Sequence, residues 1–180
     1  MSEELTELQE HAEHAKENPA LAPVSVTMAI LAVLVAVVSL LGHRAHTEEV
    51  VLQAKSSDQW AYYQAKNIRR HSDEFFVDLT SVQSTTDATA LAKLREKYLA
   101  EAERYKDEQK EIEDKARELE AEVAIEMRRA DRFDLAEVFL EIGLVITSIT
   151  LLSGRRLFWL VGIALGIIGA VVTVSGFLIH

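Results

Sequence analysis

Residues 24–42 read VSVTMAILAVLVAVVSLLG and contain no charged side chain. As a helix that rises about 1.5 Å per residue, this stretch is long enough to cross the roughly 30 Å hydrocarbon core of a bilayer. An isolated strand could not satisfy its backbone hydrogen bonds in lipid, so the stretch is expected to be helical. Six Glu and one Lys occupy residues 1–22, whereas a cleaved signal peptide begins with basic residues. The sequence therefore predicts an acidic tail followed by a retained transmembrane helix over residues 23–42.

Two further apolar stretches lie near the C-terminus. Residues 157–179 also lack charge, whereas residues 135–152 combine eleven Leu, Ile, Val and Phe with two Glu. The four residues between them, 153–156, read SGRR and fit a short loop. We predict a second transmembrane helix over residues 135–152 and a third over residues 157–180.

The long middle part, residues 43–134, is crowded with charge and predicts two helical arms outside the membrane. No Gly or Pro interrupts the first arm, and residues 81–89 (SVQSTTDAT) have the composition of a turn, with Thr86 or Asp87 as helix N-cap. Two arms joined by one short turn should fold back on each other to form an antiparallel coiled-coil hairpin roughly 60 Å long. The predicted fold is therefore an all-α membrane protein, with three spans and a hairpin between the first and the second.

The apolar rhythm of each arm predicts the residues that face the other arm. On the first arm, the residues that alternate in steps of three and four are Val51, Ala54, Asp58, Ala61, Ala65, Ile68, Ser72, Phe75, Leu79 and Val82. On the second arm, with two extra steps of four, they are Leu91, Leu94, Tyr98, Ala102, Tyr105, Gln109, Ile112, Ala116, Leu119, Val123, Met127 and Ala130.

Part of the first arm, SDQWAYYQAKNIR at residues 57–69, resembles the central signature of a bacterial membrane family known as domain of unknown function 4337. Residues 132–152, followed by Arg155-Arg156 and Phe158-Trp159, are similar to that family's closing pair of spans. The resemblance covers most of the chain from the first span onward but not the acidic tail. It implies this topology and a bacterial inner membrane, and it supplies no catalytic residues because the family has no assigned activity.

Two sets of basic residues give opposite predictions for the orientation in the membrane. The short loop with Arg155 and Arg156 favours a cytoplasmic N-terminus, because Lys and Arg in short loops stay inside. Arg44 and three arginines between residues 128 and 132 lie on the hairpin side and favour the reverse. Long loops can be exported despite their charge, so we give the short loop more weight and expect an extracytoplasmic hairpin.

Three carboxylates on one face of the second span, Asp134, Glu137 and Glu141, are the first candidate site. An acid near the centre of a span costs a few kcal/mol, which offsets much of the roughly 0.3–0.6 kcal/mol that each large apolar residue contributes. The span therefore needs a partner surface, and the spacing predicts that the acids point towards the first helix, with Arg44 as counter-charge for Asp134 or Glu137. The acids have three interpretations: interfacial acids, one paired with Arg44 and the other reached by water; a ring of acids around a symmetry axis that guides cations or protons; or a contact with a partner subunit.

Two further sets of residues predict helix contacts. Gly162, Gly166, Gly169 and Ala170 form a small-residue face on the third span, which suits close packing within one chain or between chains. The second set is an aromatic cluster on the first arm, formed by Trp60, Tyr62 and Tyr63. It fits either packing along the flank of the hairpin or a docking surface.

Composition and motifs argue against several functions. The net charge of −10 is unlike that of a nucleic-acid binder, and the absence of cysteine excludes disulfides and thiolate sites. We find no phosphate-binding loop or nucleophile elbow, and we predict no enzyme activity, no catalytic or metal-ligating residues and no cofactor. The leading prediction is a membrane-anchored scaffold that self-associates through its hairpin and glycine face, or an accessory subunit of another membrane protein. The alternative is a small oligomeric cation or proton channel that uses the acids of the second span.

Overall fold

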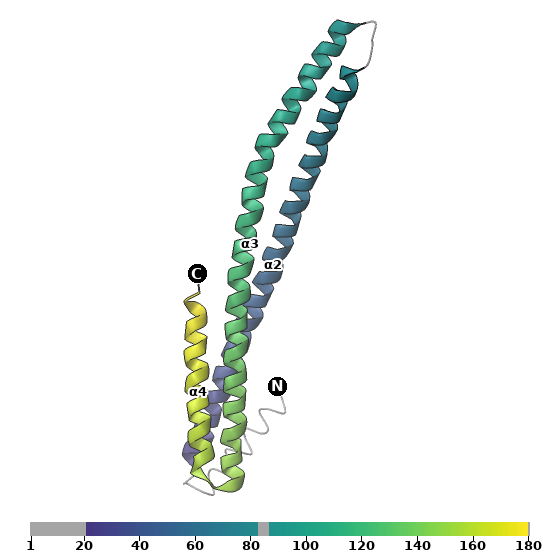
Figure 1. The fold of residues 1–180 in the computed structure, drawn as a ribbon. Coiled ribbons are helices and arrows are strands. Elements are labelled where there is room, and N and C mark those ends of the chain that lie inside the picture. Colours follow the sequence, from purple (N-terminus) through teal and green to yellow (C-terminus); the bar gives the residue numbers. More distant parts are fainter. Residues whose placement is uncertain (1–20, 83–86, 180) are drawn as a thin grey trace. The chain divides into compact units, whose positions relative to one another are not determined.

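A computed structural model describes residues 21–82 and 87–179, and this part of the chain contains helices and no strand. The helices are α2 (Ala22–Ser81), α3 (Ala88–Ser153) and α4 (Arg156–Phe177) (Figure 1). Each contains a stretch long and apolar enough to cross a membrane, by length and composition. The predicted acidic tail lies outside the described residues, apart from Leu21 and Ala22.

The helices begin and end where local chemistry allows. Pro23 is the second residue of α2, where a missing backbone N–H breaks no helical hydrogen bond. The carboxylate of Asp87 accepts a hydrogen bond of 2.9 Å from the backbone N–H of Ala90, so Asp87 is the predicted N-cap of α3. Gly154 follows α3 with a φ of 65°, a left-handed conformation that glycine adopts without steric cost.

The chain divides into two compact units, and α2 and α3 each contribute to both. The first, which we call the bundle, consists of residues up to Glu48 together with residues from Ile125 onward. The second, which we call the hairpin, consists of residues 49–124.

The bundle packs the first part of α2, the last part of α3 and all of α4 around an apolar core. Its buried residues are mostly aliphatic or small: Leu31, Val38, Ala45, Ala130, Phe133, Ala136 and Leu140. The indole N–H of Trp159 in α4 donates a hydrogen bond of 3.0 Å to the hydroxyl of Thr27 in α2. Side chains from all three helices therefore meet inside one unit.

The hairpin pairs α2 with α3 in antiparallel fashion. Three contacts join the two helices at falling positions along α3: Gln59 to Ile112, Lys66 to Glu108 and Phe76 to Tyr98. Within this unit the two helices lie side by side (Figure 1). On α3, all the predicted inward residues are buried or half-buried except Leu94 and Met127.

The predicted inward row on α2 is wrong. All ten of its residues, from Val51 to Val82, are exposed, and we call this surface the α2 stripe. A second row with the same alternation of three and four is buried or half-buried: Leu52, Ser56, Gln59, Tyr63, Lys66, Arg70, Asp73, Val77 and Thr80. The inward row of α2 is therefore the more polar of its two rows, and α3 supplies hydrogen-bond partners for two of its polar residues, Gln59 and Lys66.

Candidate functional site

The three predicted carboxylates lie in one row along α3 in the bundle, and we call them the acidic row. Asp134 reaches α2: its Oδ2 lies 3.0 Å from Nε2 of His46. Gly42 allows this approach, because a Cβ there would lie 3.2 Å from Oδ1 of Asp134. Both side chains of the pair are about half exposed, at 48% and 52%, so water weakens the interaction.

The predicted role of Arg44 as counter-charge is wrong. Among the described residues, Arg44 is exposed and forms no ion pair with Asp134 or Glu137. Successive helical residues are turned by about 100°, so the side chains of Arg44 and His46 point in nearly opposite directions. His46 has the direction that meets Asp134.

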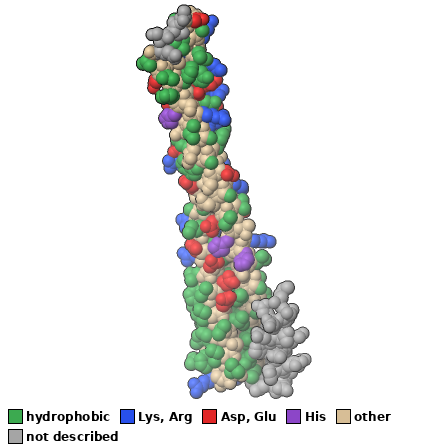
Figure 2. Space-filling model, turned by 90° about the vertical axis from the view of Figure 1, so that its right-hand side faces the viewer, with side chains coloured by type: hydrophobic (Ala, Val, Ile, Leu, Met, Phe, Trp, Pro, Cys, Tyr) green, Lys and Arg blue, Asp and Glu red, His purple; other side chains and the backbone are tan. Residues whose placement is uncertain are grey.

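The other two acids lie at the surface of the bundle. Glu137 is half-buried and Glu141 is exposed. In the part of the chain that the structure describes, neither carboxylate forms a hydrogen bond or an ion pair. The expected contact with the first helix is thus formed by Asp134 alone. Figure 2 shows acidic side chains among apolar ones on one face of the molecule.

The glycine face of α4 is occupied within the chain. A Cβ at Gly162 would lie 2.0 Å from the hydroxyl oxygen of Thr147 and 2.8 Å from the carbonyl oxygen of Gly143, both in α3. A Cβ at Gly169 would lie 2.7 Å from Leu140 of α3, and one at Gly166 would lie 2.6 Å from Leu31 of α2. These glycines are buried and Ala170 is half-buried, so this face holds α4 against its own neighbours.

The aromatic cluster lies on the hairpin and is partly used inside it. The indole N–H of Trp60 donates a hydrogen bond of 2.8 Å to Glu120 of α3, and its ring meets that of Tyr63 edge-to-face with centroids 5.6 Å apart. Tyr62 is 49% exposed, and the ammonium of Lys66 lies 5.5 Å from its ring centroid. Trp60 and Tyr63 therefore brace the hairpin, and Tyr62 is the member that faces solvent.

A charged contact in the middle of the hairpin was not predicted. The ammonium of Lys66 donates to the carboxylate of Glu108 and lies 4.8 Å from the ring centroid of Tyr105. The hydrogen bond to Glu108 raises the pKa of Lys66, and the same bond lowers the pKa of Glu108. The sequence signal for this contact was the second row on α2, because Lys66 lies in the same alternation of three and four residues as Leu52 and Val77.

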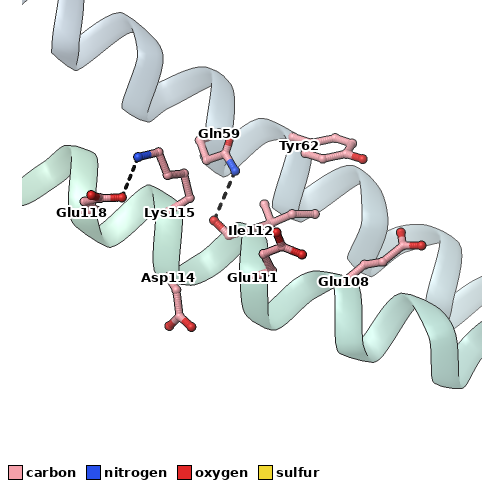
Figure 3. Close-up of a pocket in the computed structure, with 8 residues that line it drawn as sticks. All are labelled: Gln59, Tyr62, Glu108, Glu111, Ile112, Asp114, Lys115 and Glu118. Carbon is pink, nitrogen blue, oxygen red and sulfur yellow. Dashed lines mark hydrogen bonds and ion pairs between the residues drawn. The ribbon is translucent and has the colours of Figure 1, made fainter.

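An open groove runs between α2 and α3 in the hairpin, with a volume of about 670 Å³ (Figure 3). Four acids and one base line it, together with three other residues: Gln59, Tyr62, Glu108, Glu111, Ile112, Asp114, Lys115 and Glu118. Lys115 donates to Glu118, and this bond raises the pKa of Lys115. Across the described residues, no group of three His, Cys, Asp or Glu could hold a metal ion. The groove is an open, charged surface that faces solvent.

A known protein family matches almost the whole chain. The chain matches the family described as Domain of unknown function (DUF4337) over residues 20–179. It belongs to this family. The match covers the bundle and the hairpin together, so the two units are parts of one family domain. No curated protein and no solved structure matches the chain.

Proposed function

We propose that this protein is a non-enzymatic interaction protein, anchored in a membrane by the bundle, whose hairpin associates with a second copy through the α2 stripe. The observation that carries the proposal is the exposure of that stripe. Ile68, Phe75 and Val82 are 67%, 68% and 83% exposed, although they belong to a regularly spaced, mainly apolar row. Such an apolar surface on a charged helix is typical of an interaction site.

The spacing of the stripe favours a helix as its partner. Its residues alternate in steps of three and four along about nine turns of α2, which is the pattern of a two-helix contact. Small residues at Ala54, Ala61 and Ala65 allow the two backbones to approach closely. Asp58 is the charged exception, and a single polar residue in such a row sets register at some cost in stability.

Anchoring in a membrane favours a second copy of this chain as the protein that supplies the partner helix. Copies with the same topology in one membrane present their hairpins in parallel and at the same height. Each residue of the stripe then meets its own counterpart, so one surface serves both partners around a two-fold axis. The five large apolar residues of the stripe, Val51, Ile68, Phe75, Leu79 and Val82, are between 41% and 83% exposed, so a second copy would bury apolar surface that the single chain leaves open.

The localisation that goes with this proposal is a bacterial inner membrane. The resemblance to the family's closing spans supports it, together with the three helices of sufficient length. The Arg155-Arg156 loop favours a cytoplasmic N-terminus and an extracytoplasmic hairpin. A hairpin on that side would present its stripe to other copies away from the cytoplasm.

Disulfide trapping tests the proposal directly, because the chain contains no cysteine. In intact membranes, Ile68→Cys should form a disulfide with its counterpart upon mild oxidation. Gln53→Cys is a matched control, exposed on the same helix but off the stripe, and it should remain reduced.

The second readout is the mass of the full-length protein, measured by native mass spectrometry after gentle extraction from the membrane. The wild type should appear as a homo-oligomer, and Ile68→Glu combined with Phe75→Glu should shift it to the monomer, whereas Gln53→Glu should not. A monomeric mass for the wild type, together with no disulfide in Ile68→Cys, would show the proposal to be wrong.

A further inference from the structure

We infer that Glu141 is a docking point for a transmembrane helix of a different protein, one that carries a Lys or Arg near its centre. The inference rests on the proposed anchoring of the bundle in a membrane, but not on association of the hairpins. It is drawn from the level of Glu141 within the bundle, its surroundings and the charges of the chain.

The contacts between α3 and α4 show at which height Glu141 lies along the candidate spans of the bundle. Its neighbours in α3, Leu140 and Gly143, lie beside Gly169 and Gly166 of α4. These glycines lie around the middle of α4, which runs from Arg156 to Phe177. Gly166 also contacts Leu31, which lies near the middle of the apolar stretch 24–42 of α2. Glu141 is therefore at mid-height of all three candidate spans, where an ionised group is hardest to accommodate.

Apart from Glu137, one turn earlier in the acidic row, the residues around Glu141 on the surface of α3 are apolar and exposed. One turn before and one turn after it on α3, Val138 and Val145 are 49% and 60% exposed. Neighbouring Ile142 is 46% exposed. Within residues 21–82 and 87–179, no hydrogen bond or ion pair reaches the Glu141 carboxylate. An acid thus interrupts a face that would otherwise contact lipid, which marks the face as covered by another polypeptide.

Charge complementarity indicates which polypeptide covers it. The three apolar stretches of this chain, residues 24–42, 135–152 and 157–179, contain no Lys or Arg. A second copy could bring only another carboxylate to this height. A foreign span with a central Lys or Arg would bring the opposite charge, and acids inside membranes are commonly paired in this way.

A synthetic helix provides a defined probe. Full-length protein in proteoliposomes would carry a donor dye on Leu152→Cys, a side chain that is 90% exposed. The acceptor would be a Leu/Ala peptide of about 20 residues with one central Lys, compared with the same peptide bearing a central Leu. Energy transfer should show about tenfold tighter binding of the Lys peptide, the size of a strong polar contact between membrane helices.

Two variants decide whether the carboxylate at residue 141 is responsible. Glu141→Gln should bind both peptides equally, whereas Glu111→Gln, which removes an exposed charge from the hairpin, should keep the tenfold preference. Equal binding of the two peptides by wild type, or an unchanged preference in Glu141→Gln, would overturn the inference.

The controls separate this inference from the proposed function. Resistance of the wild-type chain to alkaline carbonate extraction checks the membrane anchoring on which both depend. If the wild-type chain resists extraction and Ile68→Cys forms its disulfide, but the wild type does not prefer the Lys peptide, only the inference about Glu141 fails. If it prefers the Lys peptide but stays monomeric, only the association of hairpins fails.

Discussion

The bundle and the hairpin share α2 and α3, and the bundle adds α4, but the two units pack by opposite rules. The bundle buries small and aliphatic residues, with Ala130 and Ala136 fully buried and Gly162 in near contact with the backbone of Gly143. The hairpin buries or half-buries Ser56, Gln109 and several charged residues, and leaves its most regular apolar row exposed.

Anchoring of the bundle in a membrane, as proposed above, would account for this difference. In lipid, apolar side chains gain nothing by leaving the solvent, so close contact through small residues is the main source of stability. In water, a polar inward row is tolerated when its groups find partners, as Lys66 does, and the unused apolar row favours further association. Four substitutions, with expected effects of decreasing size, test this difference between the two units.

The largest effect is expected at the closest contact in the bundle. Gly162→Val would place atoms inside contact distance of Thr147 and of the Gly143 backbone, so we expect a loss of about 3 kcal/mol in unfolding free energy. Unfolding of the detergent-solubilised protein by SDS, followed by circular dichroism, measures it. Ala164→Val, at an exposed position of α4, is the control. Equal losses in both variants would mean that close packing does not hold the bundle.

The second effect concerns the contact between Lys66 and Glu108 in the hairpin. Lys66→Met removes the partner of Glu108 and should lower the local stability of the hairpin, by less than the loss of a fully buried pair would, because the Glu108 side chain is 37% exposed and water screens the contact. Amide hydrogen exchange of the full-length protein reports it, with Lys110→Met, exposed on α3, as the control.

The direction of the pKa shifts predicts how this contact depends on pH. Because the Glu108 pKa is lowered, its contribution should be lost as pH falls through its folded value. Because the Lys66 pKa is raised, its contribution should be lost as pH rises through its own folded value. A wild-type hairpin equally stable beyond both limits would contradict the role of the pair.

The third effect tests the start of α3. Asp87→Ala removes the acceptor for the backbone N–H of Ala90 and should cost about 1 kcal/mol, whereas Asp87→Asn should cost only a few tenths. Hydrogen exchange over the first turn of α3 separates the two variants. The same exchange rate in both would show that the cap contributes nothing measurable.

The smallest effect has the opposite sign. Burial, with the nearby charge of Glu101, raises the pKa of Asp73, and its Oδ2 is buried without a hydrogen-bond partner. The folded hairpin then binds the proton more tightly than the unfolded chain, so stability should fall as pH rises from the unfolded to the folded pKa. Asp73→Asn should remove this slope and stabilise the hairpin at neutral pH by less than about 1 kcal/mol.

Asp78→Asn is the matched control for Asp73, because Asp78 lies on the same helix and is exposed. It should leave both the pH slope and the stability at neutral pH as they are in the wild type. If Asp73→Asn behaves in the same way, the charge at residue 73 is tolerated in the inward row without cost.

Much of the architecture could be predicted from local signals. Three uncharged or nearly uncharged stretches of sufficient length indicate the helices that could cross a membrane, because length and apolarity are properties of a segment by itself. Asp87 as an N-cap and the inward row of α3 were also predictable, since each depends on short-range spacing. The signature around Trp60 identified the family for the same reason.

Contacts between helices required the tertiary structure. α2 has two rows with the same alternation, and periodicity alone favours the more apolar one; the groups that α3 presents decide which row turns inward. His46 rather than Arg44 meets Asp134 because the rotation of α2 relative to α3 selects it. Which segments are helical follows from the sequence, because a helix forms from local hydrogen bonds; which faces meet depends on the packing of the helices, because a packed face needs its partner.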